Sequence, residues 1–212
     1  ALFAHDADRP LNPASVMKLV TTYAALDLLG RDYRWKTEAY LGGRLANGTL
    51  AGNLVLKGYG DPKITVEQWR AFMADLRARG LDRVTGDLVL DRSHFKLPEH
   101  DPAAFDQEPL RPYNVGPDAL LVNFKAFRFQ FAPDAPRGAV AVRADPPLPE
   151  VTLDALPQLG NGDCGDWRSL LAATWVNERT AASAAFAGRY PQSCGERDWY
   201  VALLDHPSYV FG

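Results

Sequence analysis

Hydrophobic positions near the start of the chain recur with the spacing of a helix, from Pro13 to about Leu29. Asn12 is a favoured residue for capping a helix, Pro13 suits the first helical position, and Gly30 is a common stop. The apolar residues cover most of the circumference of this helix, which is typical of a buried one. They are Val16, Leu19, Val20, Tyr23, Ala24, Leu26 and Leu28.

Extended segments dominate the rest of the sequence. Asn47-Gly48 is a strong turn signal between two such runs, so residues 36–58 are predicted to form a β-hairpin. One further helix is predicted, because Thr65 and Gln68 have the spacing of a capping box and precede an apolar stripe. Strands are predicted over residues 2–7, 83–91, 119–132, 138–145, 167–176, 180–188 and 198–204. The expected fold class is therefore α+β, with mostly antiparallel strands.

A long segment without periodicity, residues 92–118, separates two of these strands and contains five prolines. A loop of this length inside a compact domain is usually functional or disordered. At the end of the chain, residues 205–212 have the pattern of a first helical turn, with Pro207 near its start. Because a domain rarely ends on the first apolar turn of a helix, we expect the sequence to be part of a longer protein.

The composition and the absence of several motifs exclude some classes of function. The net charge of −3 argues against nucleic-acid binding, which needs clustered Lys and Arg. The sequence has no apolar run of about 18 residues, the length that a membrane-spanning helix needs. The four histidines have no metal-binding spacing, and neither a Gly-x-Ser-x-Gly elbow nor a phosphate-binding loop is present. We therefore expect no metal and no organic cofactor.

Ser15 and Lys18 form a Ser-x-x-Lys motif at the start of the first predicted helix. Side chains three positions apart lie on one face of a helix, about 5–6 Å apart at Cβ. Burial would remove water from the lysine ammonium and favour the neutral amine, which can accept the serine proton. The free N–H groups of the first turn would favour negative charge on the serine oxygen. The alternative is a polar pair on a solvent-facing turn, since so short a motif also arises by chance.

The segment around this motif, residues 11–21, resembles the active-serine helix of the penicillin-recognising enzymes. Residues 48–56, 58–62, 86–95 and 113–124 are similar to a narrower class within that group. This class is the D-Ala-D-Ala carboxypeptidase/endopeptidase penicillin-binding proteins (low-molecular-weight class C), which carry a large insertion after the active-serine helix. The resemblance covers nearly the whole chain.

The resemblance implies both an architecture and an activity. Residues 1–35 would be part of a transpeptidase-like (β-lactamase-like) domain, and residues 36–212 would be the insertion, in one or two lobes. The parent protein would be a periplasmic serine peptidase that hydrolyses peptidoglycan peptides and cross-links through an acyl-enzyme on Ser15, and β-lactams would acylate the same serine. Cys164 and Cys194 are expected to form a disulfide, which suits an oxidising compartment.

Two further motifs of the family, Ser-x-Asn and Lys-Thr-Gly, are missing from this chain. Ser183 is not followed by Asn at the required position, and Lys36-Thr37 is followed by Glu38. In the family these motifs lie beyond the insertion, so we expect this chain alone to be inactive. The alternative function is a non-catalytic module that binds peptidoglycan or a partner protein, with Ser15 inert.

Within the proline-rich segment, Asp106 and Tyr113 are the candidate substrate-binding residues. The family acts on peptides carrying a diamino acid with a free, cationic end. The resemblance implies that an acidic and an aromatic residue of this segment hold that end, and Asp106 with Tyr113 is the best match. Glu108 is the competing carboxylate. The remaining alternative is a solvated loop carboxylate that binds nothing.

Overall fold

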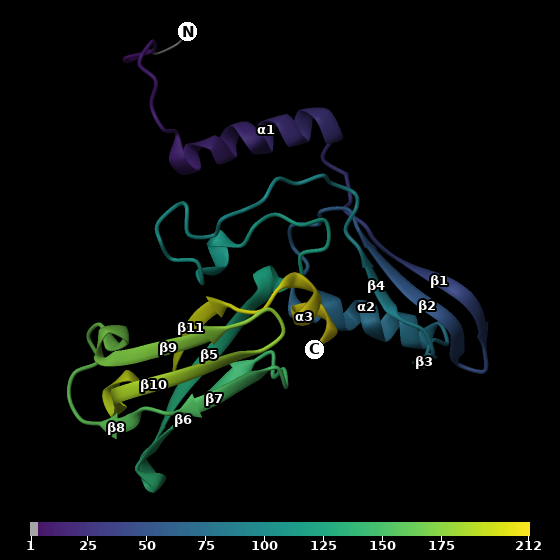
Figure 1. The fold of residues 1–212 in the computed structure, drawn as a ribbon. Coiled ribbons are helices and arrows are strands. Elements are labelled where there is room, and N and C mark those ends of the chain that lie inside the picture. The colour runs from purple at the N-terminus through teal and green to yellow at the C-terminus, as the bar shows by residue number, and fades with distance from the viewer. Residues whose placement is uncertain (1–3) are drawn as a thin grey trace. The chain divides into compact units, whose positions relative to one another are not determined.

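A computed structural model describes residues 4–212 and divides the chain into two units, residues 1–35 and residues 36–212 (Figure 1). Among the described residues, the first unit contains one α-helix, and the second contains two α-helices and all of the strands. No helix in this part of the chain is both long and apolar enough to cross a membrane. The mixture of helices and separate sheets confirms the α+β class.

The first unit begins with a 3₁₀ turn, Ala14–Val16, that continues into helix α1, Met17–Leu29. The Asn12 side chain lies just before this turn, and its Oδ1 accepts the N–H of Ala14 at 2.9 Å, but the N-cap residue of the turn is Pro13. Gly30 ends the helix with a φ of 80°, a conformation that favours glycine. The predicted helix and its predicted end at Gly30 are therefore confirmed. Its start differs from the prediction, because the α-helix begins at Met17 and neither the turn nor the helix has a side-chain cap.

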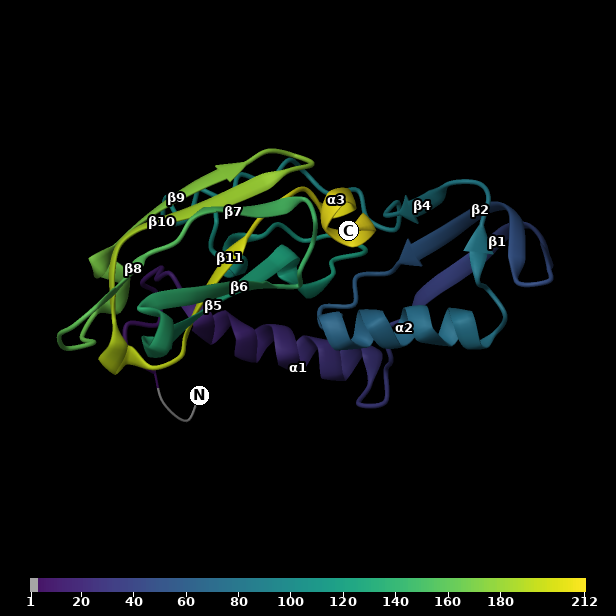
Figure 2. The same ribbon diagram turned by 90° about the horizontal axis from the view of Figure 1, so that it is seen from below.

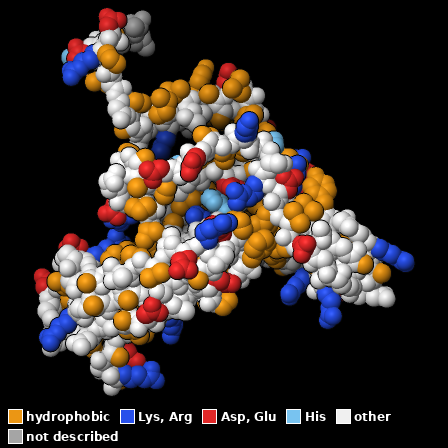
Figure 3. Space-filling model, viewed as in Figure 1, with side chains coloured by type: hydrophobic (Ala, Val, Ile, Leu, Met, Phe, Trp, Pro, Cys, Tyr) orange, Lys and Arg blue, Asp and Glu red, His pale blue; other side chains and the backbone are white. Residues whose placement is uncertain are grey.

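Helix α1 is almost entirely exposed, so the prediction that it is buried is wrong for this unit. Leu19 and Tyr23 are 72% and 73% exposed. Hydrophobic side chains accordingly crowd the surface of the helix in Figure 3. The apolar residues do surround the helix as the pattern indicated. The described part of the first unit, however, contains no second helix or strand that could cover them.

The second unit begins with a four-stranded sheet, and α2 lies alongside it (Figure 2). The predicted hairpin turns at Asn47-Gly48, as expected. The strand predicted over residues 83–91 is broken in two, because the Asn53 side chain accepts the N–H of Asp87 at 2.9 Å between the two parts. Both parts pair with the second strand in parallel. The strands are β1 (Thr37–Ala46), β2 (Thr49–Gly58), β3 (Arg83–Val84) and β4 (Leu88–Asp91).

Helix α2, Val66–Ala78, has the capping box that the sequence predicts. The Thr65 hydroxyl accepts the N–H of Gln68 at 3.3 Å, and the Gln68 side chain accepts the N–H of Thr65 at 3.0 Å. Two of the four N–H groups that a helix start leaves free are thereby satisfied. The apolar face of the helix packs on the core that contains the buried leucines of β2. Its packing residues are Trp69, Phe72, Met73 and Leu76.

A seven-stranded sheet forms most of the rest of the second unit, in the order β11-β5-β6-β8-β10-β7, with β9 paired to β10. Phe127, Phe129 and Phe131 alternate along β5 and are fully buried. Phe129 and Phe131 contact Phe186 of β10, whose ring centroid lies 4.9 Å from that of Phe131, and Phe127 contacts Tyr209. Most pairs are antiparallel, whereas β7 and β8 pair with β10 in parallel. The strands are β5 (Ala126–Asp134), β6 (Ala139–Asp145), β7 (Val151–Ala155), β8 (Gln158–Gly160), β9 (Leu171–Asn177), β10 (Ala182–Pro191) and β11 (Arg197–Ala202).

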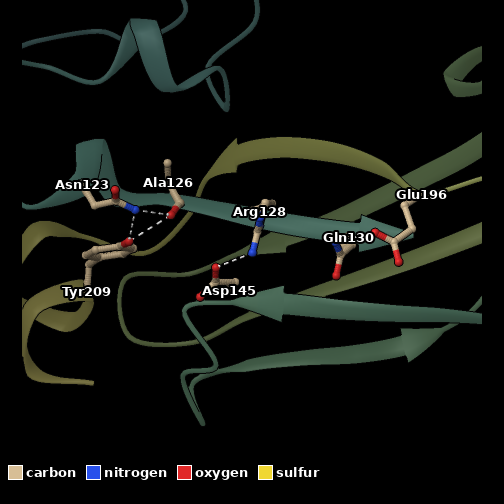
Figure 4. Close-up of polar contacts among 7 residues, drawn as sticks. All are labelled: Asn123, Ala126, Arg128, Gln130, Asp145, Glu196 and Tyr209. Atoms are coloured by element: carbon tan, nitrogen blue, oxygen red, sulfur yellow. Dashed lines mark hydrogen bonds and ion pairs between the residues drawn. The ribbon is translucent and has the colours of Figure 1, made fainter. Parts of the chain in front are cut away.

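Helix α3, His206–Phe211, is the helical turn predicted over residues 205–212. Its Tyr209 is tied to the beginning of β5 (Figure 4). The Tyr209 hydroxyl donates to the Ala126 carbonyl at 2.9 Å and accepts from the Asn123 side-chain amide at 2.8 Å. The end of the described chain is therefore anchored in the sheet.

The strand predicted over residues 119–132 begins only at Ala126. Asn123, Phe124 and Lys125 have φ values of 49°, 52° and 50° and form a left-handed turn. For residues other than glycine this conformation costs about 1–2 kcal/mol each, so it persists only where neighbouring contacts offset it. The strand predicted over residues 2–7 is also absent, since residues 4–7 are not extended in a sheet, and residues 2 and 3 lie outside the described residues.

Cys164 and Cys194 form the predicted disulfide, which links positions 30 residues apart with their Cα atoms 4.8 Å from each other. The bridge joins the segment before β9 to the turn after β10. It therefore closes a loop around the β9–β10 hairpin.

Replacing both cysteines by alanine is expected to lower the free energy of unfolding by about 3–4 kcal/mol, because the bridge restricts the unfolded chain. Urea denaturation of the wild type and of the C164A/C194A variant measures this difference. Thiol titration is the control. The denatured, unreduced wild type should show no reactive thiol, and two reactive thiols would contradict the bridge.

Candidate active site

The Ser-x-x-Lys motif lies at the start of the helical segment of the first unit. Ser15 is in the 3₁₀ turn and Lys18 is in the first turn of α1. Lys18 Nζ donates a hydrogen bond to Ser15 Oγ at 3.3 Å. The spacing of three residues therefore places the two side chains on one face, within reach for proton transfer.

Ser15 and Lys18 are both exposed. The sequence pattern indicated a buried lysine, but Lys18 is exposed, because no other helix or strand of the described first unit covers α1. Within this unit the pair therefore has the geometry of a nucleophile and a base but not the enclosing walls. If the amine is neutral, it can accept the serine proton while Oγ attacks an electrophilic carbon.

Asp106 lies in the long proline-rich loop of the second unit and accepts three hydrogen bonds. Its Oδ2 accepts the Tyr113 hydroxyl at 2.7 Å. Its Oδ1 accepts the Asn114 side-chain amide at 2.7 Å and the N–H of Glu108 at 3.0 Å. The predicted pair of Asp106 and Tyr113 is thus in direct contact.

The hydrogen bond from Tyr113 is the main reason why the pKa of Asp106 lies below its usual value, and Asn114 adds to the effect. The same bond raises the pKa of Tyr113. All three donors are neutral, and in the described chain Asp106 has no ion-pair partner within 4.0 Å. The carboxylate is therefore held in one orientation while its negative charge stays available.

Glu108, the competing carboxylate, is held less firmly. Its side chain lies 3.6 Å from Arg111 and is 57% exposed. A charge that is already near an arginine and surrounded by water is a weaker candidate for a fixed binding group. The geometry therefore favours Asp106 over Glu108 as the ordered carboxylate of this loop.

Asn114 is a residue of this cluster that sequence reasoning missed. It is only 7% exposed and is the one buried polar residue of the described core. Its side-chain amide donates to Asp106 at 2.7 Å and to the Glu108 carbonyl at 3.0 Å. Its main-chain carbonyl accepts a hydrogen bond from His100 Nε2 at 2.8 Å. The only sequence signal for Asn114 was its position directly after Tyr113, because the burial of a residue cannot be inferred from sequence in a loop without hydrophobic periodicity.

The structure thus assembles two pairs, Ser15 with Lys18 and Asp106 with Tyr113. The first pair belongs to the first unit and the second pair to the second unit. The prediction that Asp106 and Tyr113 bind the substrate stays a prediction. In the described part of the chain, no group of three or more His, Cys, Asp or Glu side chains is placed to hold a metal ion.

A second perturbed carboxyl has a structural explanation. Glu38, at the start of β1, accepts hydrogen bonds from the hydroxyls of Tyr40 and Tyr59 and from Lys36. These donors lower the pKa of Glu38 to about 2, with Tyr40 the largest cause. Lys36 also lies 4.4 Å from the centre of the Tyr59 ring. The cluster fixes the start of β1 against the end of β2 and offers no free donor or acceptor that would indicate a ligand.

Comparison with known proteins gives a consistent result. Residues 1–209 match the D-Ala-D-Ala carboxypeptidase 3 (S13) family. The chain is 38% identical over 88 residues to the D-alanyl-D-alanine carboxypeptidase DacB of Haemophilus influenzae, an alignment that covers 42% of the chain and 18% of that protein. It is 34% identical over 115 residues to the D-alanyl-D-alanine carboxypeptidase of Actinomadura sp. (strain R39), covering 50% of the chain and 21% of that protein.

The fold is similar to that of penicillin-binding protein 4 (dacB) from Haemophilus influenzae. The TM-score is 0.68 at 22% identity, over 95% of this chain and 44% of the other. The same protein in complex with a β-lactam gives a TM-score of 0.59 at 22% identity, over 94% of this chain and 41% of the other. At this identity the likeness shows the fold alone. The chain spans less than half the length of these structures, and about a fifth of each curated relative is aligned.

Replacing Tyr113 by phenylalanine is expected to raise the pKa of Asp106 toward its ordinary value, because the strongest donor to the carboxylate is lost. Titration of the Asp106 carboxyl carbon by NMR measures the shift. Tyr200→Phe is the matched control, since in the described chain the Tyr200 hydroxyl makes no hydrogen bond. An Asp106 pKa that is unchanged in the Tyr113 variant would contradict the bond.

Proposed function

The chain belongs to the D-Ala-D-Ala carboxypeptidase 3 (S13) family, and from this premise we propose that it forms part of a serine-type D-Ala-D-Ala carboxypeptidase and endopeptidase. The substrates would be the stem peptides and the cross-links of peptidoglycan. The observation that carries the proposal is the 3.3 Å hydrogen bond between Lys18 Nζ and Ser15 Oγ at the start of a helix. A nucleophile and a base in contact are the minimum that acyl transfer needs.

In the proposed reaction, Ser15 Oγ attacks the carbonyl carbon of the penultimate D-Ala. The Oγ proton passes to the neutral amine of Lys18, and an Oγ–C bond forms. The C–N bond to the terminal D-Ala then breaks, and the departing nitrogen takes up a proton. Water hydrolyses the acyl-enzyme in the second half of the reaction and restores the serine. A β-lactam would be opened by the same attack and would remain on Ser15.

Asp106 and Tyr113 are the proposed recognition site for the cationic end of a diamino acid in the substrate. The support is the fixed, negative and unpaired state of the Asp106 carboxylate, which three neutral donors orient. An ammonium would add a charge-assisted hydrogen bond to such a group. Tyr113 is 66% exposed, so its ring is available to wall one side of the ligand.

This chain alone is proposed to be inactive. The Ser-x-Asn and Lys-Thr-Gly motifs are absent from its 212 residues. The exposure of Ser15 and Lys18 supports the same view, because an acyl-transfer site works in an enclosed and preorganised environment. The proposed location is the periplasm, which agrees with the Cys164–Cys194 disulfide.

Ser15→Ala in the full-length protein is expected to abolish covalent labelling by a fluorescent penicillin, because no other group would form the acyl bond. Labelling is read from a gel after denaturation. Ser183→Ala, which changes a serine of β10 that no motif includes, should label like the wild type. Persistent labelling of the Ser15 variant would refute the nucleophile. A wild type that never labels would favour the non-catalytic binding module.

Asp106→Asn in the full-length protein is expected to slow hydrolysis of a diamino-acid peptide by about tenfold to a thousandfold, since a desolvated charge pair is lost. Acylation by a β-lactam without an amine should hardly change. Steady-state kinetics with both substrates measures the difference. Glu108→Gln is the matched control and should leave both rates unaltered. Equal losses on both substrates in the Asp106 variant would indicate a folding role instead.

A further inference from the structure

The long loop encloses a cavity of about 440 Å³ within the second unit. The loop lines it with four prolines and with Arg92, the turn before β5 contributes Lys125, and α3 contributes His206. This volume is within the range of about 300–1,000 Å³ that is typical of small-ligand sites. The cavity combines an apolar wall with a few converging polar groups, which is the common composition of such sites.

Positive charge exceeds negative charge in the lining. Arg92 and Lys125 are cations, and Asp118 is the one carboxylate among the lining residues. The side chain of Asp118 is only 6% exposed, although the whole residue is half-buried, and it is already engaged. Its Oδ2 lies 3.0 Å from Arg92 Nε, and its Oδ1 accepts the N–H of Leu120 at 2.8 Å. The cavity therefore has one cation more than its carboxylate can neutralise.

Lys125 is the more buried of the two cations, and its hydrogen bonds are incompletely satisfied. Its Nζ donates to the Leu204 carbonyl at 2.7 Å, and this is its one bond to the described residues. A lysine ammonium carries three hydrogens, so two remain without a protein acceptor. Burial lowers the pKa of Lys125. The charge of Asp205 also favours the charged form of Lys125, but Asp205 is paired with Arg179 at 3.2 Å. An anion bound beside Lys125 would offset the cost of burying its charge.

His206 provides a second unsatisfied group. Its side chain is 18% exposed, and its Nε2 is buried with no hydrogen-bond partner in the described chain. The nearest oxygen is Oδ2 of Asp118, at 3.9 Å. Burial lowers the pKa of His206 to about 4, so the ring is neutral at pH 7. Buried polar atoms in proteins nearly always have a hydrogen-bond partner, so His206 contributes an unsatisfied polar group to the wall of the cavity.

The backbone around the cavity is strained at two places. Lys125 ends the left-handed turn of three residues, and Leu204, whose carbonyl accepts the lysine, has a φ of 66°. Strained residues of this kind cluster at ligand sites, where surrounding structure holds them. Here the strain fixes the direction of Lys125 Nζ and of its acceptor.

We propose that this cavity binds a small molecule with a carboxylate at one end and a short aliphatic or acyl group at the other. The carboxylate lies against Lys125 and His206, where donors exceed acceptors. The aliphatic end lies against the apolar part of the wall. That part includes Leu97, Pro98, Pro109, Leu110, Val115 and Pro117.

Isothermal titration calorimetry of the intact protein with N-acetylalanine tests the proposal. Saturable, one-site binding is expected. The neutral amide of N-acetylalanine, which has the same shape without the charge, should not bind. Inorganic phosphate supplies an anion without the aliphatic end, and it should bind more weakly than N-acetylalanine. No saturable binding of N-acetylalanine, or equal binding of its amide, would overturn the proposal. Tighter binding of phosphate would overturn the carboxylate assignment.

Lys125→Met is expected to weaken N-acetylalanine binding by about tenfold to a hundredfold, as hydrogen bonds to charged groups contribute about 1.5–3 kcal/mol. Lys63→Met is the matched control, because Lys63 is exposed and its side chain contacts no described residue. It should bind like the wild type. Unchanged affinity in the Lys125 variant would refute the site.

His206→Phe covers the case in which the Lys125 variant fails to fold, because Lys125 also anchors Leu204. The His206 Nε2 makes no hydrogen bond in the described chain, so its replacement by an apolar ring should leave the melting temperature unchanged or raise it. Binding of N-acetylalanine should nevertheless weaken by about tenfold, the effect of one hydrogen bond to a charged carboxylate. A variant with normal stability and normal affinity would overturn the role of His206 in the site.

Discussion

The ion pair between Arg92 and Asp118 is the interaction on which the proposed recognition groups of the second unit depend. It joins the two ends of the proline-rich loop, with Nε and Oδ2 3.0 Å apart and Asp118 almost fully buried. A carboxylate in such a place is stable only while its partner remains, because an isolated buried charge is costly. Between these two residues, the loop contains Asp106 and also lines the cavity.

Hydrogen bonds within the loop fix the orientation of its side chains. Asn114 links the proposed Asp106 site to the cavity. Its side-chain amide orients Asp106, and its main-chain carbonyl binds His100 of the cavity wall. The prolines reduce the number of conformations that the unfolded loop can adopt, so less entropy is lost when it becomes ordered. Binding groups are often carried by loops on a rigid support, and here the two sheets and α2 are that support.

The sequence was most informative where the determinants are local. The Gly30 stop, the Thr65–Gln68 box and the Asn47-Gly48 turn each depend on residues a few positions apart, and all are present. The contact of Ser15 with Lys18 follows from helical spacing in the same way. The cysteine pairing came from family resemblance. The parallel pairing of β4 with β2, the left-handed turn ending at Lys125 and the burial of Asn114 depend on distant parts of the chain, so no local pattern indicated them.

The pairing of β5 with β11 has a consequence for how the protein forms during synthesis. Phe131 is opposite Arg197 in this pair and Ala126 is opposite Ala202, so the strand that carries the buried phenylalanines has no partner on that side until residues 197–202 have left the ribosome. Pairs between such distant positions slow folding, because the intervening chain must be closed first. Until then β5 has one unpaired edge and an apolar face, and a chaperone that shields extended apolar segments would protect it at this stage.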